Sequence, residues 1–242
     1  MITNEKITTI TGEYNQRWNE TKKLSRYHFD PTLNDDNAGY YRVIATLKGD
    51  WTKDLEKARK THKPFYWPSK SRKDEDYDYT LEEQQCLDWG IDPWKTPVYM
   101  QAIVDDSYEV LNKVADALGI VDATINVQTQ YTGQMHHLHI DALAGLGPRH
   151  SVSDIQENED EYIRVFVTLQ DWTMGHIIQF GNTYYKQWKA GEVVWFPWQD
   201  TPHSTANTSH TPRTIIKLTG RKTDFTRYLL AHGHRSYAIS LS

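Results

Sequence analysis

Three histidines and an aspartate lie within six positions of the segment QYTGQMHHLHIDALAG, residues 130 to 145. Imidazole nitrogens and carboxylate oxygens are common ligands of transition metals, so this cluster is a candidate metal site. Side chains alternate between the two faces of a β-strand, which predicts that His137, His139 and Asp141 share one face. His136 is expected on the opposite face. His139 with Asp141, or His137 with His139, could then hold one ion, and the local strand leaves both pairs open.

A third ligand must come from a distant part of the chain, and His203 stands out through its surroundings. In AGEVVWFPWQDTPHSTANTSHTPRTIIKLTG, His203 follows a strand-like run that ends at Pro197 and a polar turn. Arg213 comes ten residues later, and the intervening STANTSHTP suits the tip of a hairpin. We therefore predict an antiparallel pairing in which His203 and Arg213 lie opposite one another and face the same way.

Two imidazoles and one carboxylate form the facial triad of non-heme Fe(II) oxygenases, which leaves coordination positions open for other ligands. A 2-oxoacid occupies two of these positions and leaves one for O₂. The planar fork of Arg213 could hold the far carboxylate of 2-oxoglutarate in a bidentate, charge-assisted pair. Two other interpretations stay open. One is a cupin-type metalloenzyme that uses His137, His139 and His203 without 2-oxoglutarate, and the other is a non-catalytic jelly-roll binding module.

The hydrophobic pattern indicates which elements position these residues. Residues 50–62 and 105–119 are predicted to be helices, and Gly119 is expected to end the second. Other segments have the β-branched content of short strands: 40–47, 123–131, 162–172, 176–181, 192–197 and 213–220. After residue 122 these strands follow one another without intervening helices, which predicts an antiparallel barrel or sandwich.

With these motifs in place, the chain resembles the 2-oxoglutarate/Fe(II)-dependent dioxygenases, in particular the prolyl-4-hydroxylase-like branch. The resemblance rests on motifs in the expected order over residues 123–220. They are YTGQMHHLHID, RVFVTLQDW, GHIIQFG, KAGEVVWFPWQDTPH and the final Arg213. Two positions depart from the family pattern: Gly175 is followed by His176 instead of a second glycine, and Ile215 stands where many members have Ser or Thr.

The resemblance implies a mostly β fold with flanking helices around a double-stranded β-helix (jelly-roll, cupin-like) core. It selects His139, Asp141 and His203 as metal ligands, with Fe(II), 2-oxoglutarate and O₂ as cofactor and cosubstrates and ascorbate as an optional further cofactor. The aspartate in this set implies a hydroxylase. By the same carry-over, the cosubstrate-contacting residues are Arg213, Tyr131 and Thr168.

A single domain over residues 1–242 is expected. Residues 1–122 would form an N-terminal helical and aromatic support region, 123–220 the catalytic jelly-roll core, and 221–242 a C-terminal covering segment. A flap is expected at residues 144–160, where glycines mix with acidic residues.

Composition restricts the possible partners. The chain of 242 residues has a net charge of -5, so it has no overall basic field that would indicate nucleic acid. A single cysteine allows no internal disulfide, which favours a cytoplasmic protein. No signal peptide and no membrane-spanning run are expected. The expected substrate is a peptidyl side chain or a small molecule, and the sequence indicates no oligomeric state.

Overall fold

The computed structural model describes residues 40–66, 81–90, 95, 97–141, 158–199 and 201–241. The expected flap therefore lies outside the described residues up to position 157. The elements, with η for 3₁₀ helices, are β1 (Arg42–Lys48), α2 (Thr52–Thr61), β2 (Lys63–Phe65), α3 (Leu81–Asp88), β3 (Tyr99–Ile103), η3 (Leu111–Lys113), α4 (Val114–Ala117), β4 (Ile120–Gln130), β5 (Met135–His139), η5 (Glu159–Glu161), β6 (Tyr162–Thr168), β7 (His176–Phe180), β8 (Thr183–Tyr185), β9 (Glu192–Trp195), β10 (His203–Asn207), β11 (Arg213–Lys222), α6 (Asp224–His232) and β12 (Ala238–Ser240).

Two sheets form the fold. Strands β9, β6, β11 and β4 are neighbours in the larger sheet, and β5, β10, β7 and β8 form the smaller one. The chain crosses between the sheets after β4, β5, β6, β8, β9 and β10, which is the path of a double-stranded β-helix. The protein therefore has the expected jelly-roll fold with flanking helices. Strands β1 and β12 extend the larger sheet at one edge, and β3 and β2 extend it at the other.

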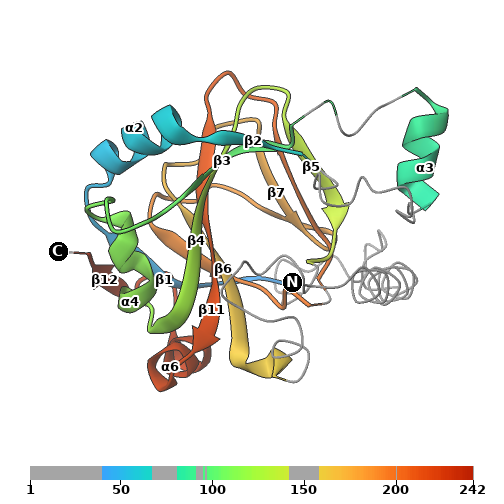
Figure 1. Cartoon of the computed structure of the whole chain (residues 1–242). Helices are drawn as coiled ribbons and strands as arrows, with labels where there is room; N and C mark the ends of the chain where they lie inside the picture. The colour runs from blue at the N-terminus through green and yellow to red at the C-terminus, as the bar shows by residue number, and fades with distance from the viewer. Residues whose placement is uncertain are drawn as a thin grey trace, which may run out of the picture.

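Apolar side chains fill two separate layers. Phe166 and Ile215 of the larger sheet pack with Phe180 of the smaller sheet in the space between the sheets. Alternate residues of the same strands, such as Val165 and Ile216, belong to a second cluster on the outer face of the larger sheet, because successive side chains of a strand point to opposite faces. Helices α2, α4 and α6 cover this outer cluster, and Figure 1 shows α2 and α4 on the side of β4 and β11 away from β5 and β7. No helix among the described residues is long and apolar enough to cross a lipid bilayer.

The predicted hairpin between His203 and Arg213 is wrong. His203 begins β10, which pairs with β5 and β7 in the smaller sheet. Arg213 begins β11, which pairs with β4 and β6 in the larger sheet, and its direct neighbour is Gln130. The turn residues do reverse the chain, but in a jelly roll the reversal carries it from one sheet to the other instead of into an adjacent strand.

The predicted helix at 105–119 is correct only in its second half. Helical residues begin at Leu111, and the buried carboxylate of Asp54 on α2 explains this start. Its oxygens accept hydrogen bonds from the backbone N–H groups of Glu109, Val110 and Leu111 at 3.0, 2.8 and 2.8 Å. An anion at the first N–H groups of a helix satisfies donors that have no partner within the helix. Here the anion comes from another helix, and the hydrophobic period does not reveal it.

We expect Asp54→Ala to lower the free energy of unfolding by about 2–4 kcal/mol, because one buried and two partly buried N–H groups lose a charged acceptor. Urea unfolding followed by circular dichroism measures the change. Asp106→Ala is the matched control, since Asp106 is an exposed aspartate of the loop that precedes the helix. Equal unfolding midpoints for the two variants would contradict this role of Asp54.

Candidate metal centre

Pairing between β5 and β10 creates the centre of the site. His139, the last residue of β5, lies opposite His203, the first residue of β10, and the two imidazole rings are 4.3 Å apart between centroids. Asp141 follows two residues after β5. One ligand atom from each of these three side chains lies within 4.8 Å of the others, as a shared metal ion requires. The set His139, Asp141 and His203 is the one group of this kind among the described residues.

Arg164 of β6 fixes the orientation of the Asp141 carboxylate. Its Nη1 forms an ion pair with Oδ1 of Asp141, while its Nε donates a hydrogen bond to Thr219 Oγ1 at 3.0 Å. The second oxygen, Oδ2, lies 3.7 Å from His203 Nε2. Oδ2 is buried and receives no hydrogen bond from the described residues. Burying a carboxylate oxygen without a hydrogen-bond donor costs free energy, and a bound metal ion would offset that cost.

Backbone carbonyls set the protonation of both histidines. His139 Nδ1 lies 2.7 Å from the carbonyl oxygen of His137, and His203 Nδ1 lies 3.1 Å from that of Thr201. A carbonyl can only accept, so each Nδ1 carries the proton and each Nε2 holds the lone pair. This is the usual arrangement of metal-binding histidines, whose second nitrogen donates to a neighbouring oxygen.

The charge states also suit a metal. Burial lowers the pKa of both His139 and His203, so the imidazoles are neutral at neutral pH. Burial by itself raises the pKa of Asp141, but the positive charge of Arg164, with smaller contributions from His203 and Lys217, holds that pKa well below its usual range. Neutral imidazoles beside an ionised carboxylate are the ligand forms that a divalent cation needs.

The expectation that His136 faces away from the other histidines is wrong. His139 pairs with His203, but Thr205 pairs with His136 instead of the residue that regular alternation requires, so β5 contains one extra residue between the two pairs. Such a bulge breaks the alternation of faces. The His136 ring consequently lies 3.8 Å from that of His139 between centroids. His136 therefore borders the candidate metal centre.

Arg213 lies inside the barrel on β11 and is 2% exposed. Its Nε and Nη2 donate to Gln130 Oε1 at 3.1 and 2.6 Å, and Gln130 is fixed in turn by a hydrogen bond to the carbonyl of Val98 at 2.9 Å. The remaining nitrogen, Nη1, is buried and has no hydrogen-bond partner among the described residues. Burial lowers the pKa of Arg213 to about 9, so the guanidinium keeps its charge at neutral pH.

The structure does not bring the other two predicted cosubstrate contacts to the metal ligands. Tyr131 is 37% exposed, and its ring meets the edge of the His62 ring at 5.9 Å. Thr168 is buried, and its hydroxyl donates to the carbonyl of Lys189 at 2.6 Å. The roles assigned to Tyr131 and Thr168 stay predictions.

The sequence analysis missed Lys217, which lies on the inner face of β11. Its positive charge acts on Asp141 and His203. Strand alternation contained the signal, because Lys217 is four residues beyond Arg213 and so shares its face. A local pattern does not distinguish an inward lysine from a solvated one, because the face of a strand that is buried depends on its neighbours.

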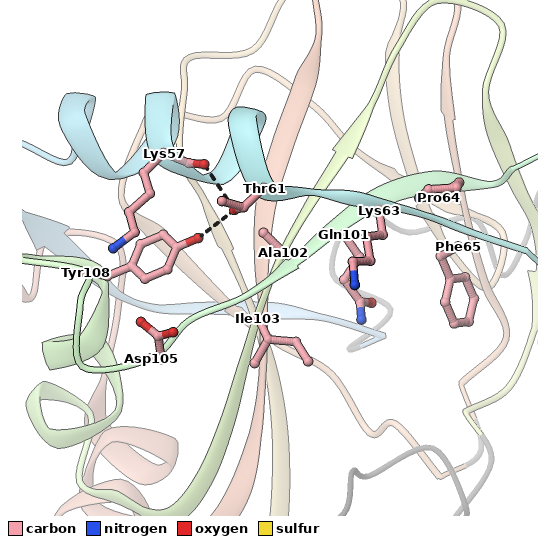
Figure 2. A pocket seen from close by; sticks show the side chains of 10 residues that line it. All are labelled: Lys57, Thr61, Lys63, Pro64, Phe65, Gln101, Ala102, Ile103, Asp105 and Tyr108. Carbon is pink, nitrogen blue, oxygen red and sulfur yellow. Dashed lines mark hydrogen bonds between the residues drawn. The ribbon is translucent and has the colours of Figure 1, made fainter.

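A groove of about 340 Å³ lies between α2, β2 and β3. Figure 2 shows Lys57, Thr61 and Tyr108 at one end and Phe65 at the other. Lys57 is already engaged, since its Nζ donates to the carbonyl of Ser107 at 2.6 Å and lies over the Tyr108 ring at 4.6 Å. The metal ligands do not line this groove, but Phe65 stacks on Tyr99, whose ring contacts His136.

Comparisons with known proteins add little. No family model and no curated protein matches the chain. Solved structures with weak similarity include a prolyl-4-hydroxylase from Pseudomonas putida. Its sequence is 14% identical, the match covers 59% of this chain and 83% of that chain, and the TM-score is 0.36. A viral collagen prolyl hydroxylase from Paramecium Bursaria Chlorella virus-1 has 16% identity, 52% and 80% coverage and a TM-score of 0.37. A cupin 2 conserved barrel domain protein from Salinispora arenicola has 7% identity, 55% and 83% coverage and a TM-score of 0.30. Similarities this weak carry no argument about activity.

We expect Asp141→Ala and His203→Ala each to weaken Mn(II) binding by more than about a hundredfold. Loss of a residue that only supports a ligand typically costs 10- to 100-fold, and loss of a ligand costs more. Isothermal titration calorimetry on metal-free protein measures the affinity. His210→Ala is the control, because His210 is exposed and lies on the loop after β10. Mn(II) affinity that survives either ligand variant would argue against this metal centre.

Proposed function

We propose that the protein is a non-heme Fe(II), 2-oxoglutarate-dependent oxygenase that hydroxylates a C–H bond. The observation that supports this proposal most is the convergence of His139, Asp141 and His203 within the barrel. Two imidazoles and one carboxylate, with further positions left for other ligands, are the ligand set of this class. A closed structural zinc site would more commonly take four protein ligands.

In this proposal Nε2 of His139, Nε2 of His203 and Oδ2 of Asp141 hold the iron. Bound Fe(II) and 2-oxoglutarate supply the activation of O₂, with succinate and CO₂ as co-products of hydroxylation. The protein itself fixes the orientation of the three ligand side chains. The carbonyls of His137 and Thr201 orient the two rings, and Arg164 holds Oδ1 so that Oδ2 points toward His203.

Arg213 is the anchor that we propose for the far carboxylate of 2-oxoglutarate. A buried guanidinium needs an anion or a full set of hydrogen bonds, because desolvating a charge without compensation is costly. Gln130 is neutral and satisfies only Nε and Nη2. The partnerless Nη1 fits a carboxylate oxygen that arrives with the cosubstrate.

The substrate classes that we propose remain a peptidyl side chain or a small molecule. Residues bordering the candidate metal ligands are aromatic: the His136 ring lies 3.8 Å from that of His139, and Tyr99 contacts His136. Lys217 adds a positive charge that acts on Asp141 and His203. Such a mouth suits an organic substrate with a polar or charged group better than a purely aliphatic one.

We expect the Fe(II)-loaded protein to convert 2-oxoglutarate to succinate, slowly without substrate and faster with it. We also expect Arg213→Ala to weaken binding of the inert analogue N-oxalylglycine to the Mn(II)-loaded protein by about thirtyfold or more. Removing one partner of a buried charged pair costs about 2–5 kcal/mol. Calorimetry gives the binding constant, and chromatography gives the succinate yield.

Arg227→Ala is the control for the arginine variant, because Arg227 forms a partly exposed ion pair with Glu161 on the outside of the protein. Mn(II) binding without any binding of 2-oxoglutarate or N-oxalylglycine would refute the proposal. That outcome would favour a cupin-type metalloenzyme that does not use 2-oxoglutarate. Absence of metal binding would instead favour a non-catalytic binding module.

A further inference from the structure

Lys217 belongs to a row of inward-facing side chains that crosses the larger sheet. Directly paired residues of antiparallel strands point to the same face. Lys217 pairs with Phe166 of β6 on one side and with Asn126 of β4 on the other, and Asn126 pairs with Ile103 of β3. Phe166 lies in the core between the two sheets, so the whole row faces the inside of the barrel.

This row runs from the neighbourhood of His203 toward the edge strands of the larger sheet. At its inner end, the Phe166 ring lies 6.0 Å from that of His203. Lys217 and Asn126 are partly exposed, and at the outer end Ile103 is 65% exposed. Ile103 also lines the groove in Figure 2, where it lies below the strand β3 that carries it. Within this row, Lys217 is the charged residue, and it lies next to Phe166, whose ring is near that of His203.

The ammonium group of Lys217 forms no hydrogen bond or ion pair with the described part of the chain. Asp141 is the carboxylate whose charge acts on it, but Arg164 already occupies Oδ1 of that carboxylate. Burial and repulsion from Arg164 lower the pKa of Lys217 to about 8, so it still carries its charge at neutral pH. A divalent metal on the three ligands would add further positive charge to the same space.

The distance between Arg213 and Lys217 along β11 indicates that the two side chains bind different ligands. They share the inner face and lie four residues apart, which is about 13 Å along the strand. Arg213 is held by Gln130 at the end where β4 and β10 finish. Lys217 instead lies beside Phe166, whose ring is 6.0 Å from that of His203.

We propose that Lys217 binds an oxyanion of the substrate beside the metal, and therefore that the substrate carries a carboxylate or a comparable anionic group close to the C–H bond that reacts. This inference rests on the metal centre of the proposed function and deepens it, because it restricts the substrate to anionic molecules. Lys217 acts here as a binding and positioning residue. Its place between Phe166 and Asn126 directs its side chain toward the inside of the barrel.

The test uses full-length protein loaded with Mn(II) and N-oxalylglycine, so that the metal and cosubstrate positions are filled. Malonate serves as the anionic probe, and calorimetry measures its dissociation constant for wild type, Lys217→Met, Lys217→Arg and Lys222→Met. Met keeps the length of the side chain without its charge. Lys222 is the matched control, because it ends the same strand and the charges acting on it are those of Arg227, Glu161 and Asp160.

We expect Lys217→Met to weaken malonate binding by about ten- to one-hundredfold, as a lost charge-assisted hydrogen bond predicts. Lys217→Arg should restore most of the affinity, and Lys222→Met should match wild type. None of the variants should bind Mn(II) or N-oxalylglycine more weakly than wild type, since Lys217→Met removes a positive charge that acts on Asp141 and His203. Retained binding of both also shows that each variant is folded.

Three outcomes would overturn the inference: equal malonate affinity in wild type and Lys217→Met, no malonate binding by wild type, or a loss confined to N-oxalylglycine. The last would make Lys217 a cosubstrate residue. In all three the metal centre still binds Mn(II) and N-oxalylglycine in wild type, so the proposed function survives. Wild-type protein that binds neither of these would instead refute the proposed function.

Discussion

The site depends on one constraint, the backbone pairing of β5 with β10. This pairing places His139 opposite His203, and no side-chain interaction could substitute for it, because the two histidines come from segments more than sixty residues apart. The extra residue in β5 lets His139 take this position while turning His136 toward the same centre. Bulges commonly redirect side chains next to functional sites. Here one irregularity decides how many imidazoles border the metal ligands.

Charge is distributed unequally between the two sheets. The smaller sheet and the turn that follows β5 supply the metal ligands, whereas the larger sheet supplies Arg164, Lys217 and Arg213 on its inner face. Arg164 neutralises the charge of Asp141. Arg164 is itself held by a hydrogen bond to Thr219 and by the Trp198 ring, since its guanidinium carbon lies 5.7 Å from the centroid of that ring. Arg213 and Lys217 face the space between the sheets without a carboxylate partner among the described residues. The inner face of the larger sheet is therefore the cationic wall of the barrel.

Short-range patterns predicted much of the fold correctly. Helix 50–62 and all six predicted strands appear with small shifts at their ends, and the succession of short strands correctly indicated an antiparallel barrel or sandwich. The family resemblance, not the strand pattern, specified a jelly roll. Two of the wrong predictions, the helix at 105–110 and the hairpin after His203, have one physical cause. Residues 105–110 looked helical, but the Asp54 carboxylate moves the start to Leu111. STANTSHTP looked like a hairpin tip, but β10 and β11 enter different sheets. In both cases a contact from a distant segment overrides the local preference.

The sequence by itself determined the ligand types, their order along the chain and the fold class, because side-chain chemistry and hydrophobic period are local properties. Resemblance to a family, not strand geometry, selected Asp141 over His137. Only the tertiary structure decided that Arg164 orients Asp141, that Gln130 holds Arg213, that the His136 ring lies against that of His139 and that Lys217 points inward. Each of these facts depends on the register between strands far apart in the chain, and a shift of one residue in that register would turn every one of these side chains to the other face of its sheet.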